Sequence, residues 1–463
     1  MKLPETKYYL KNINIAIPVI LSFAGQALVQ VADSIMAGRL GATQLAAVSL
    51  AGTVVMNVLV IGIGLSIGLT PISGNFWAKN NFKSVSIYFQ NSLLVNFITS
   101  LLLTLLLFAF LPFLYMIGQP KEVLDITGTY YMYIALSVIP FMLFLAFKQF
   151  LEGTGNTRIA MNITLLANTL NIILNYVLMF GKLGFPKMGI DGAGLATLIS
   201  RIFMPIAFWY LINRNNLYKK YFLFFRKAHF SIKKQIELIK IGLPIAGQMS
   251  LEFFSLSIIT IMMGWMGTNS LAANQIVQTM ISLTFMITNG IAAASTILVS
   301  HAYGEKNLAN VRKYGFAGMH ISLGIMSIAG LIFLFLGEQI AMLFTTSTEV
   351  IAISGKIFIV VAIFEIFDGL QVTALGALRG IMDVNRAMIY ALISYSIISV
   401  PFAYLAGFVF KWGEMGLMSG FAIGLLTASI LFITRFKRKT SNSRSLFINL
   451  KHEKKDLLKQ INI

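Results

Sequence analysis

Residues 93–114 read LLVNFITSLLLTLLLFAFLPFL, an apolar run that contains no charged side chain. About 20 apolar residues in a helix are long enough to cross the ~30 Å hydrocarbon core of a bilayer. Strands of membrane β-barrels are shorter and alternate lipid-facing with lumen-facing residues, which this continuous run does not do. The run therefore predicts a helix that spans a membrane.

Similar apolar runs recur along the whole chain. Of its 463 residues, 57% are hydrophobic and 11% are charged, whereas a soluble domain has roughly 25% charged residues. The mean hydropathy is +0.79. These values exclude an ordinary soluble protein and predict an all-α integral membrane protein. Twelve transmembrane helices are expected, at residues 13–37, 45–72, 91–117, 129–151, 160–181, 190–212, 237–264, 272–299, 315–337, 352–378, 388–410 and 415–434.

Several familiar motifs and residue types are absent from the sequence. The chain has no cysteine, which excludes disulfides and thiolate metal sites. It has no Walker A or H-E-x-x-H motif, so we expect neither enzymatic activity nor a cofactor. A G-x-S-x-G match at residues 64–68 lies inside an apolar helix, where small residues favour close helix packing, as do Gly416, Gly420 and Gly424. The polar start of the chain and the lack of a nearby cleavage site predict no cleaved signal peptide.

Basic residues are distributed unevenly between alternate loops. The net charge is +19, and with the N-terminus inside, the inner segments hold 27 Lys and Arg while the outer loops hold six. Cytoplasmic loops carry the excess of Lys and Arg in membrane proteins. Both termini are therefore predicted to be cytoplasmic, and the charge indicates topology rather than nucleic-acid binding.

The second half of the chain repeats the first at an offset of 226 residues. Pro18 then aligns with Pro244, and Gly41 aligns with Gly267. The repeat predicts two pseudo-symmetric six-helix bundles in the same orientation, a plan known among transporters, whose substrate sites lie near the bilayer midplane. The expected parts are an N-terminal six-helix lobe (1–212), a basic cytoplasmic linker (213–235), a C-terminal six-helix lobe (236–434) and a basic cytoplasmic tail (435–463).

Four acidic residues lie inside predicted helices, namely Asp33, Glu252, Glu365 and Asp368. A charge at the centre of a membrane helix costs about 2.5 kcal/mol or more, so an intramembrane acid is a candidate functional group. Burial favours the protonated form, which suits proton uptake and release, and carboxylate oxygens can alternatively hold a small hard cation. The competing interpretation is helix packing, with each acid hydrogen-bonded to a neighbour.

Neutral polar and aromatic side chains accompany these acids. Asn171 and Asn175 share a helix face and could complete an oxygen cage around Asp33 with Thr197; interhelical hydrogen bonding is the alternative. Aromatic and methionine residues near the other acids could hold a flat organic cation, with core packing as the alternative for each. The expected substrate-contacting residues are Glu365, Phe253, Phe285, Met286 and Phe364. Three basic residues lie near predicted cytoplasmic helix ends, where they can reach water, and are assigned no function: Lys148, Arg201 and Lys240.

Several segments together resemble one transporter family. They are ADSIMAGRLGATQLAAVSL, EGTGNTR, GIDGAGLATLISR, GLPIAGQMSLEFF, LAANQIV, SHAYGE and DGLQVTALGALRG. The set is similar to that of the multidrug and toxic compound extrusion (MATE) family, and within it to the NorM-like branch. The resemblance implies two six-helix bundles facing a central cleft. It also implies export driven by an inward sodium or proton gradient across a bacterial cytoplasmic (inner) membrane.

The resemblance implies roles for individual residues as well. The three functional carboxylates of the NorM-like branch, with sodium as the favoured coupling ion, are matched by Asp33, Glu252 and Asp368. Polar positions near the first-lobe cation site are matched by Asn171, Asn175 and Thr197. Some members have Tyr where this chain has Phe364, so one hydroxyl of the second site is absent here.

The sequence therefore predicts a secondary active multidrug efflux antiporter that exports organic, mostly cationic compounds in exchange for sodium or protons by alternating access. The expected partners are small organic cations and membrane lipids, with no nucleic acid, and a monomer is expected. A lipid-linked oligosaccharide flippase of a related superfamily is the alternative, although it should line its cleft with basic residues, whereas the mid-membrane charges here are acidic. An intramembrane enzyme would need a catalytic constellation, and a passive channel would conduct ions without substrate.

Overall fold

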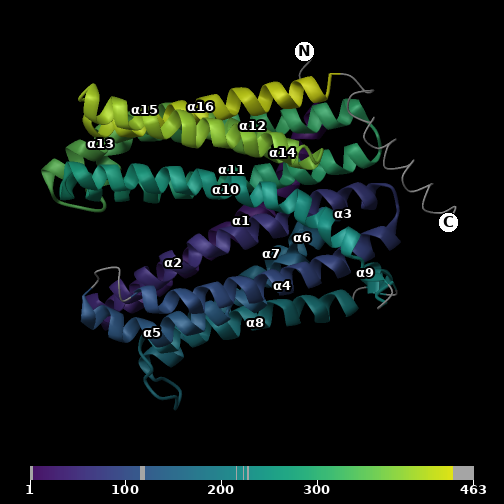
Figure 1. Cartoon of the computed structure of the whole chain (residues 1–463), viewed down its shortest axis with the longest axis horizontal. Helices are drawn as coiled ribbons and strands as arrows, with labels where there is room; N and C mark the ends of the chain where they lie inside the picture. The colour runs from purple at the N-terminus through teal and green to yellow at the C-terminus, as the bar shows by residue number, and fades with distance from the viewer. Residues whose placement is uncertain (1–3, 115–119, 215, 223, 227–228, 442–463) are drawn as a thin grey trace. The chain divides into compact units, whose positions relative to one another are not determined.

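A computed structural model describes residues 4–114, 120–214, 216–222, 224–226 and 229–441 (Figure 1). Within these residues the regular secondary structure is entirely helical. Twelve of the described helical stretches are long and apolar enough to cross a membrane. The predicted all-α membrane fold and the predicted number of spans are therefore confirmed.

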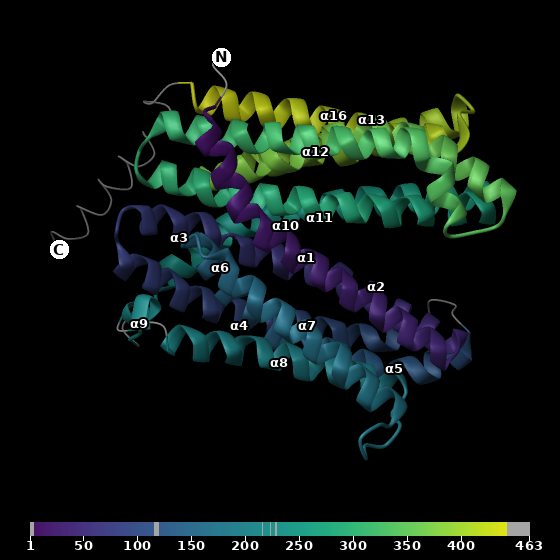
Figure 2. The same ribbon diagram turned by 180° about the vertical axis from the view of Figure 1, so that it is seen from behind.

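Contacts within the chain divide it into two compact units. The N-terminal unit comprises Ile17–Ser250, and the C-terminal unit comprises Met1–Ala16 together with Leu251–Ile463. Helices α1 (Thr6–Leu40) and α10 (Ile232–Met266) therefore each begin in one unit and continue in the other. Figure 2 shows the start of α1 beside α12 (Leu308–Met342), where the Tyr8 hydroxyl donates to Asn310 Oδ1 at 2.8 Å.

The two units begin their corresponding helices in the same way. In the N-terminal unit, Asn81 Oδ1 accepts a hydrogen bond from the Ser84 N–H at 3.0 Å. In the C-terminal unit, Asn307 Oδ1 accepts one from the Asn310 N–H at 3.1 Å. Such side-chain caps satisfy backbone donors that have no partner at a helix start. The two caps stand 226 residues apart, so the offset found in the sequence recurs in local structure.

Most helices of the described chain lie wholly inside one unit. In the N-terminal unit they are α2 (Ala42–Ile67), α3 (Leu69–Ala78), α4 (Phe82–Leu114), α5 (Lys121–Leu136), α6 (Val138–Gly153), α7 (Thr157–Phe180), α8 (Ile190–Arg214) and α9 (Asn216–Phe222). In the C-terminal unit they are α11 (Thr268–Gly304), α12, α13 (Thr348–Gly380), α14 (Val384–Ala391), the π-helix η2 (Leu392–Ser399), α15 (Val400–Tyr404), the π-helix η3 (Leu405–Val409) and α16 (Gly413–Lys439).

The helix boundaries differ from the predicted ones in a systematic way. Several helices extend past their apolar runs, as α4 does by starting at Phe82 rather than at 91, because helical hydrogen bonding continues into polar residues. The predicted span 388–410 is one continuous helical stretch with π-helical parts on both sides of Pro401. Proline removes a backbone donor, so irregular winding beside it is expected.

The segment predicted as a linker (213–235) is structured where it is described. It contains α9 and the start of α10, and its residues bind α4 of the same unit. The Asn91 side-chain amide donates to the His229 carbonyl at 2.9 Å, and that of Gln90 donates to the Arg226 carbonyl at 3.0 Å. Tyr221 of α9 is 2% exposed. The predicted tail begins within α16, and its residues 442–463 lie outside the described chain.

Small residues allow helices to approach closely, as the sequence predicts. A Cβ atom at Gly64 would overlap the backbone of Ala246, and one at Gly68 would lie 2.9 Å from the Gly242 nitrogen, so α2 contacts α10 backbone to backbone. In the C-terminal unit, the glycines at 416, 420 and 424 of α16 face η3, α15 and η2 in the same manner. Such contacts hold membrane helices together by close packing.

Candidate functional site

The structure brings together the four polar residues predicted for the first lobe. Asp33 lies on α1, Asn171 and Asn175 on α7, and Thr197 on α8. The Asn175 side-chain amide donates both to Asp33 Oδ1 and, at 3.1 Å, to Asn171 Oδ1. The Asn171 amide in turn donates to Thr197 Oγ1 at 3.3 Å. These contacts form one continuous polar chain, the Asp33 cluster, across three helices.

The Asp33 cluster has spare acceptor capacity. Asn175 is fully buried, both of its amide N–H groups are used, and its Oδ1 has no hydrogen-bond partner among the described residues. A buried acceptor without a donor costs free energy. Carboxylate and amide oxygens are the ligands that small hard cations take. The donor set therefore fits a small cation bound by Asp33 and neutral oxygens.

Arg201 is a neighbour of this cluster that the sequence interpretation left without a role. It lies in the interior of α8, not near its end, and its Nη1 donates to the Ser137 hydroxyl at 2.8 Å. Its guanidinium stacks 4.6 Å above the Phe141 ring and interacts electrostatically with Asp33. Its position in a predicted span was the available signal, because an intramembrane charge is a candidate functional group by default.

A second polar cluster, the Glu252 cluster, lies in the C-terminal unit. Gln371 of α13 connects two of the predicted acids, because its Nε2 donates to Glu252 Oε1 at 3.1 Å and to Asp368 Oδ1 at 3.2 Å. The hydroxyl of Tyr395, in η2, donates to Gln371 Oε1 at 2.8 Å. All four residues are buried, and Asp368 Oδ2 has no partner among the described residues. Two carboxylates with a free oxygen again fit a small cation.

Lys148 also departs from its expected exposure at a helix end. It is 4% exposed, its Nζ lies 3.8 Å from Glu152 Oε1, and it sits 4.9 Å above the Phe23 ring. A buried charge needs a partner of this kind. Both residues belong to α6 of the N-terminal unit, apart from the bonded chain of the Asp33 cluster.

The residues predicted to contact substrate fall into two groups. Phe253, Phe285 and Met286 are half-buried. Glu365 and Phe364 are 0% exposed, and the Phe364 ring packs edge-on against Phe421 at 5.7 Å. Glu365 Oε1 instead lies 3.1 Å from the Thr284 hydroxyl of α11. In this structure these two side chains therefore contact protein rather than an open surface.

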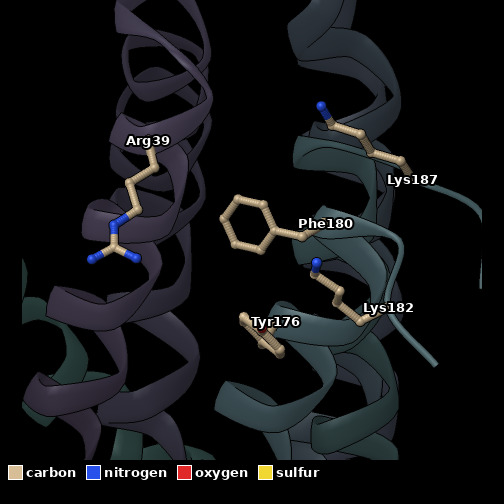
Figure 3. Close-up of a pocket in the computed structure, with 5 residues that line it drawn as sticks. All are labelled: Arg39, Tyr176, Phe180, Lys182 and Lys187. Atoms are coloured by element: carbon tan, nitrogen blue, oxygen red, sulfur yellow. The ribbon is translucent and has the colours of Figure 1, made fainter.

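A cavity of about 260 Å³ lies at the ends of α1 and α7 in the N-terminal unit. Figure 3 shows its lining, in which cationic side chains face aromatic rings. The lining residues are Arg39, Tyr176, Phe180, Lys182 and Lys187. Three cations repel a cationic ligand, and the cavity includes none of the predicted acids, so it does not suit an organic cation.

Any cation in either cluster would depend on few acidic ligands. Across the residues that the structure describes, no three or more His, Cys, Asp or Glu side chains gather as a metal-ion cluster. Sodium, which is held by one or two carboxylates and neutral oxygens, is compatible with this arrangement, whereas a thiolate or imidazole site is not.

Known proteins share both the sequence and the fold of this chain. The profile of a family described as MatE matches residues 18–177 and 244–405. A protein of Rhodopseudomonas palustris named "Probable multidrug resistance protein NorM" is 32% identical over 433 residues, which cover 93% of this chain and 91% of that protein. A protein of Bacillus licheniformis with the same name is 29% identical over 427 residues, 92% of this chain and 94% of that protein. The crystal structure of the eukaryotic MATE transporter AtDTX14 matches with a TM-score of 0.85 at 19% identity, covering 95% of this chain and 98% of that chain, and supports the fold alone.

Proposed function

The chain belongs to the MatE family, and from this premise we propose that it is a secondary active antiporter that exports organic cations in exchange for sodium or protons. The family is one of multidrug efflux transporters in membranes. The coupling ion, the substrate class and the residues that serve them are the parts that we propose here.

One observation carries the proposal. Each unit holds a buried polar cluster with an intramembrane carboxylate and an oxygen atom that lacks a donor, Asn175 Oδ1 in one unit and Asp368 Oδ2 in the other. A polar cluster with a purely structural role would be fully hydrogen-bonded, because unmet buried acceptors are costly. Spare oxygen capacity in both units supports two places where a sodium ion or a proton exchanges.

The proposed cycle is alternating access, with the clusters as the coupling groups. When the sites are open to the outside, a sodium ion or proton enters at Asp33 or at the pair Glu252 and Asp368. The bound cation shifts the protein toward the inward-open state only through its different affinity for the two states. Inside, an organic cation competes for the same negative carboxylates and is carried out. Asn171, Asn175 and Thr197 orient the first site.

The predicted substrate-contacting residues have different proposed roles, according to their burial. Half-buried Phe253, Phe285 and Met286 are placed to offer ring faces and a flexible thioether to a flat cation. Fully buried Phe364 and Glu365 would support the site from within the C-terminal unit. Such adaptable surfaces suit a broad substrate range.

The membrane, the orientation and the oligomeric state of the transporter are also proposals. The excess of Lys and Arg in alternate loops supports cytoplasmic termini. The bacterial relatives support a bacterial cytoplasmic (inner) membrane. We propose that one chain is the working unit, with membrane lipids around it.

The decisive test uses proteoliposomes that contain ethidium. A sodium gradient at fixed pH and a proton gradient without sodium are imposed in turn on the wild type, Asp368→Asn and Glu252→Gln. We expect dye movement in the wild type and its loss in both variants, which keep polar side chains of the same shape. The control is Glu349→Gln, an exposed acid on the same helix α13.

The outcomes separate the alternatives. Full export by folded Asp368→Asn would contradict the assignment of this carboxylate. If folded wild-type protein moves no dye under either gradient, the antiporter is rejected. That result would favour the lipid-linked oligosaccharide flippase. Ion current without substrate in a bilayer recording would indicate a channel.

A further inference from the structure

Glu365 has an environment unlike that of the other intramembrane acids. It lies at the middle of the 33-residue helix α13 and is 0% exposed. Its Oε2 is buried and has no hydrogen-bond partner among the described residues. The five ion pairs found in the described chain do not include it. An ionised carboxylate with so little solvation is strongly disfavoured, so this environment selects the protonated acid.

The hydroxyl of Thr284 can serve either protonation state of Glu365. Its oxygen lies 3.1 Å from Glu365 Oε1 and 2.8 Å from the Ile281 carbonyl oxygen. A hydroxyl has one hydrogen to donate and two lone pairs to accept with. When Glu365 is protonated, its O–H donates to Thr284, whose own hydrogen goes to Ile281. When Glu365 is ionised, Thr284 rotates and donates to it, so the acid keeps a partner in both states.

The two acids of the Glu252 cluster have no such partner that can either donate or accept in the contacts to Gln371. Gln371 donates one N–H to Glu252 and the other to Asp368, and Tyr395 donates to the Gln371 carbonyl oxygen. Amide N–H groups can only donate, so these contacts favour ionised carboxylates, the form that binds a cation. Three residues apart on one helix, Glu365 and Asp368 interact electrostatically. The two acids are therefore buried neighbours with different partners: Asp368 accepts from an amide N–H, whereas Glu365 contacts a hydroxyl that can donate or accept.

The titratable groups near Glu365 among the described residues are those of the Glu252 cluster, namely Asp368, Glu252 and Tyr395, with Arg379 interacting with Glu252 and Tyr395. Helix α11 contributes Thr284, α12 contributes Met326, which lies against Gly369, and α16 contributes Phe421, which lies against Phe364. The nearby acids are Asp368 on α13 itself and, through Gln371, Glu252 on α10. Protonation of Glu365 is therefore coupled directly to the charge of Asp368 and, through the Glu252 cluster, to Arg379.

We propose that Glu365 carries a proton of its own through the transport cycle, separately from the cation site at Glu252 and Asp368, with Thr284 as its positioning residue. In the inward-open state the O–H bond of Glu365 breaks and the proton passes to water on the inside. In the outward-open state the carboxylate takes a proton from water on the outside. The C-terminal unit then couples export to two different charges, a proton and a cation.

This inference rests on the proposed antiport and is tested in the same proteoliposomes. Glu365→Gln keeps the shape of the side chain and an acceptor for Thr284 but cannot release a proton. We expect the ratio of proton-driven to sodium-driven ethidium export, each measured with the other gradient absent, to fall by about tenfold or more. Asp368→Asn should lose export under both gradients, because the substrate competes for this carboxylate. Glu349→Gln, an exposed acid on the same helix, is the matched control.

Two further measurements keep the test decisive. The infrared difference spectrum between the wild type and Glu365→Gln at neutral pH should contain the band of a protonated carboxylic acid that the variant has lost. Thr284→Val should reduce proton-driven export, and Thr284→Ser, which keeps the hydroxyl, should restore it.

Failure of the inference can be told apart from failure of the antiport. Wild-type protein that exports with neither gradient rejects the proposed function. Wild-type protein that exports only with sodium, or Glu365→Gln that keeps proton-driven export or loses both kinds equally, overturns the inference and leaves the antiport in place.

Discussion

At the scale of the residue, Gln371 fixes the geometry of the Glu252 cluster although it carries no charge. Its two N–H groups bind different acids, and its carbonyl oxygen accepts from Tyr395. An amide that is free to turn over would present oxygen to the acids and repel them. The two carboxylates prevent this because they can only accept, and the Tyr395 hydroxyl adds to the preferred orientation by donating to the carbonyl oxygen.

Replacing Tyr395 by phenylalanine should therefore weaken the cluster without removing an acid. A hydrogen bond of this kind contributes about 1 kcal/mol, so we expect sodium affinity to fall by roughly fivefold. Sodium titration of ethidium export measures the effect. Tyr404→Phe, at an exposed tyrosine of α15, should change nothing, and an equal effect there would contradict the assignment.

Glu5 lies before the first membrane-spanning helix and pairs with two lysines. Its carboxylate oxygens are 2.7 Å from Lys7 Nζ and 2.6 Å from Lys313 Nζ. Hydrogen bonds from Lys313 and Lys7 lower the pKa of Glu5 from 4.5 to about 2. A carboxyl whose pKa is lowered by folding stabilises the protein above its unfolded pKa. This contribution is lost as the pH falls from about 4.5 toward 2.

The variant Glu5→Gln should melt below the wild type at neutral pH, and the two melting temperatures should converge through that acidic window. Because the pair is exposed, salt should also reduce the difference. Thermal melts in detergent over a pH series measure both effects. A difference in melting temperature that stays constant with pH would show that Glu5 acts through something other than its charge.

The sequence predicted the acids of both clusters but not all of their partners. Asp33, Glu252 and Asp368 stand out because a charge in an apolar run is costly. Gln371 and Tyr395 do not stand out, because neutral polar side chains are ordinary in membrane helices. Their meeting depends on tertiary packing across 24 residues, with Tyr395 presented by a π-helix. No periodicity in a single sequence reports such a contact.

At the scale of the element, apolar run length was sufficient to predict all twelve spans. It did not predict α9, because this helix has only seven residues and therefore contains no apolar run of spanning length. It also did not predict the ends of α4 or of α12, where capping asparagines rather than hydrophobicity decide the start.

The contact between α2 and α10 gives a prediction at this scale. A methyl group at Gly64 would overlap the Ala246 backbone, which cannot rotate away as a side chain does. Gly64→Ala should destabilise the folded protein by about 1–3 kcal/mol, the usual cost of overpacking. Gly52→Ala on the same helix has open space around its new Cβ and is the control. Equal melting temperatures for the two variants would contradict the close approach.

At the scale of the whole molecule, α1 and α10 belong to both units. Pro18 and Pro244 lie inside these helices near the residues where the units divide. Each proline removes one helical hydrogen bond and makes its helix easier to bend. The sequence showed the repeat of the two prolines but not this sharing, because the expected lobes were contiguous segments of chain.

A movement of one unit relative to the other must pass through these two helices. Pro244→Ala restores a backbone donor in α10 and should stiffen it, so we expect slower ethidium turnover by several-fold together with a higher melting temperature. Pro205→Ala changes a proline of α8, a helix that lies wholly within the N-terminal unit. Slowing of the same size in Pro205→Ala would show that bending at Pro244 is not what limits transport.

The sharing of α1 also has a consequence for how the protein is made. Tyr8 binds Asn310, a partner 302 residues further along the chain. At a synthesis rate of about 5–20 residues per second, the start of α1 waits on the order of 15–60 s before that partner exists. During this time the start of α1 lacks its partner on α12. The insertion machinery or the surrounding lipid must therefore accommodate the start of α1 until α12 has been synthesised.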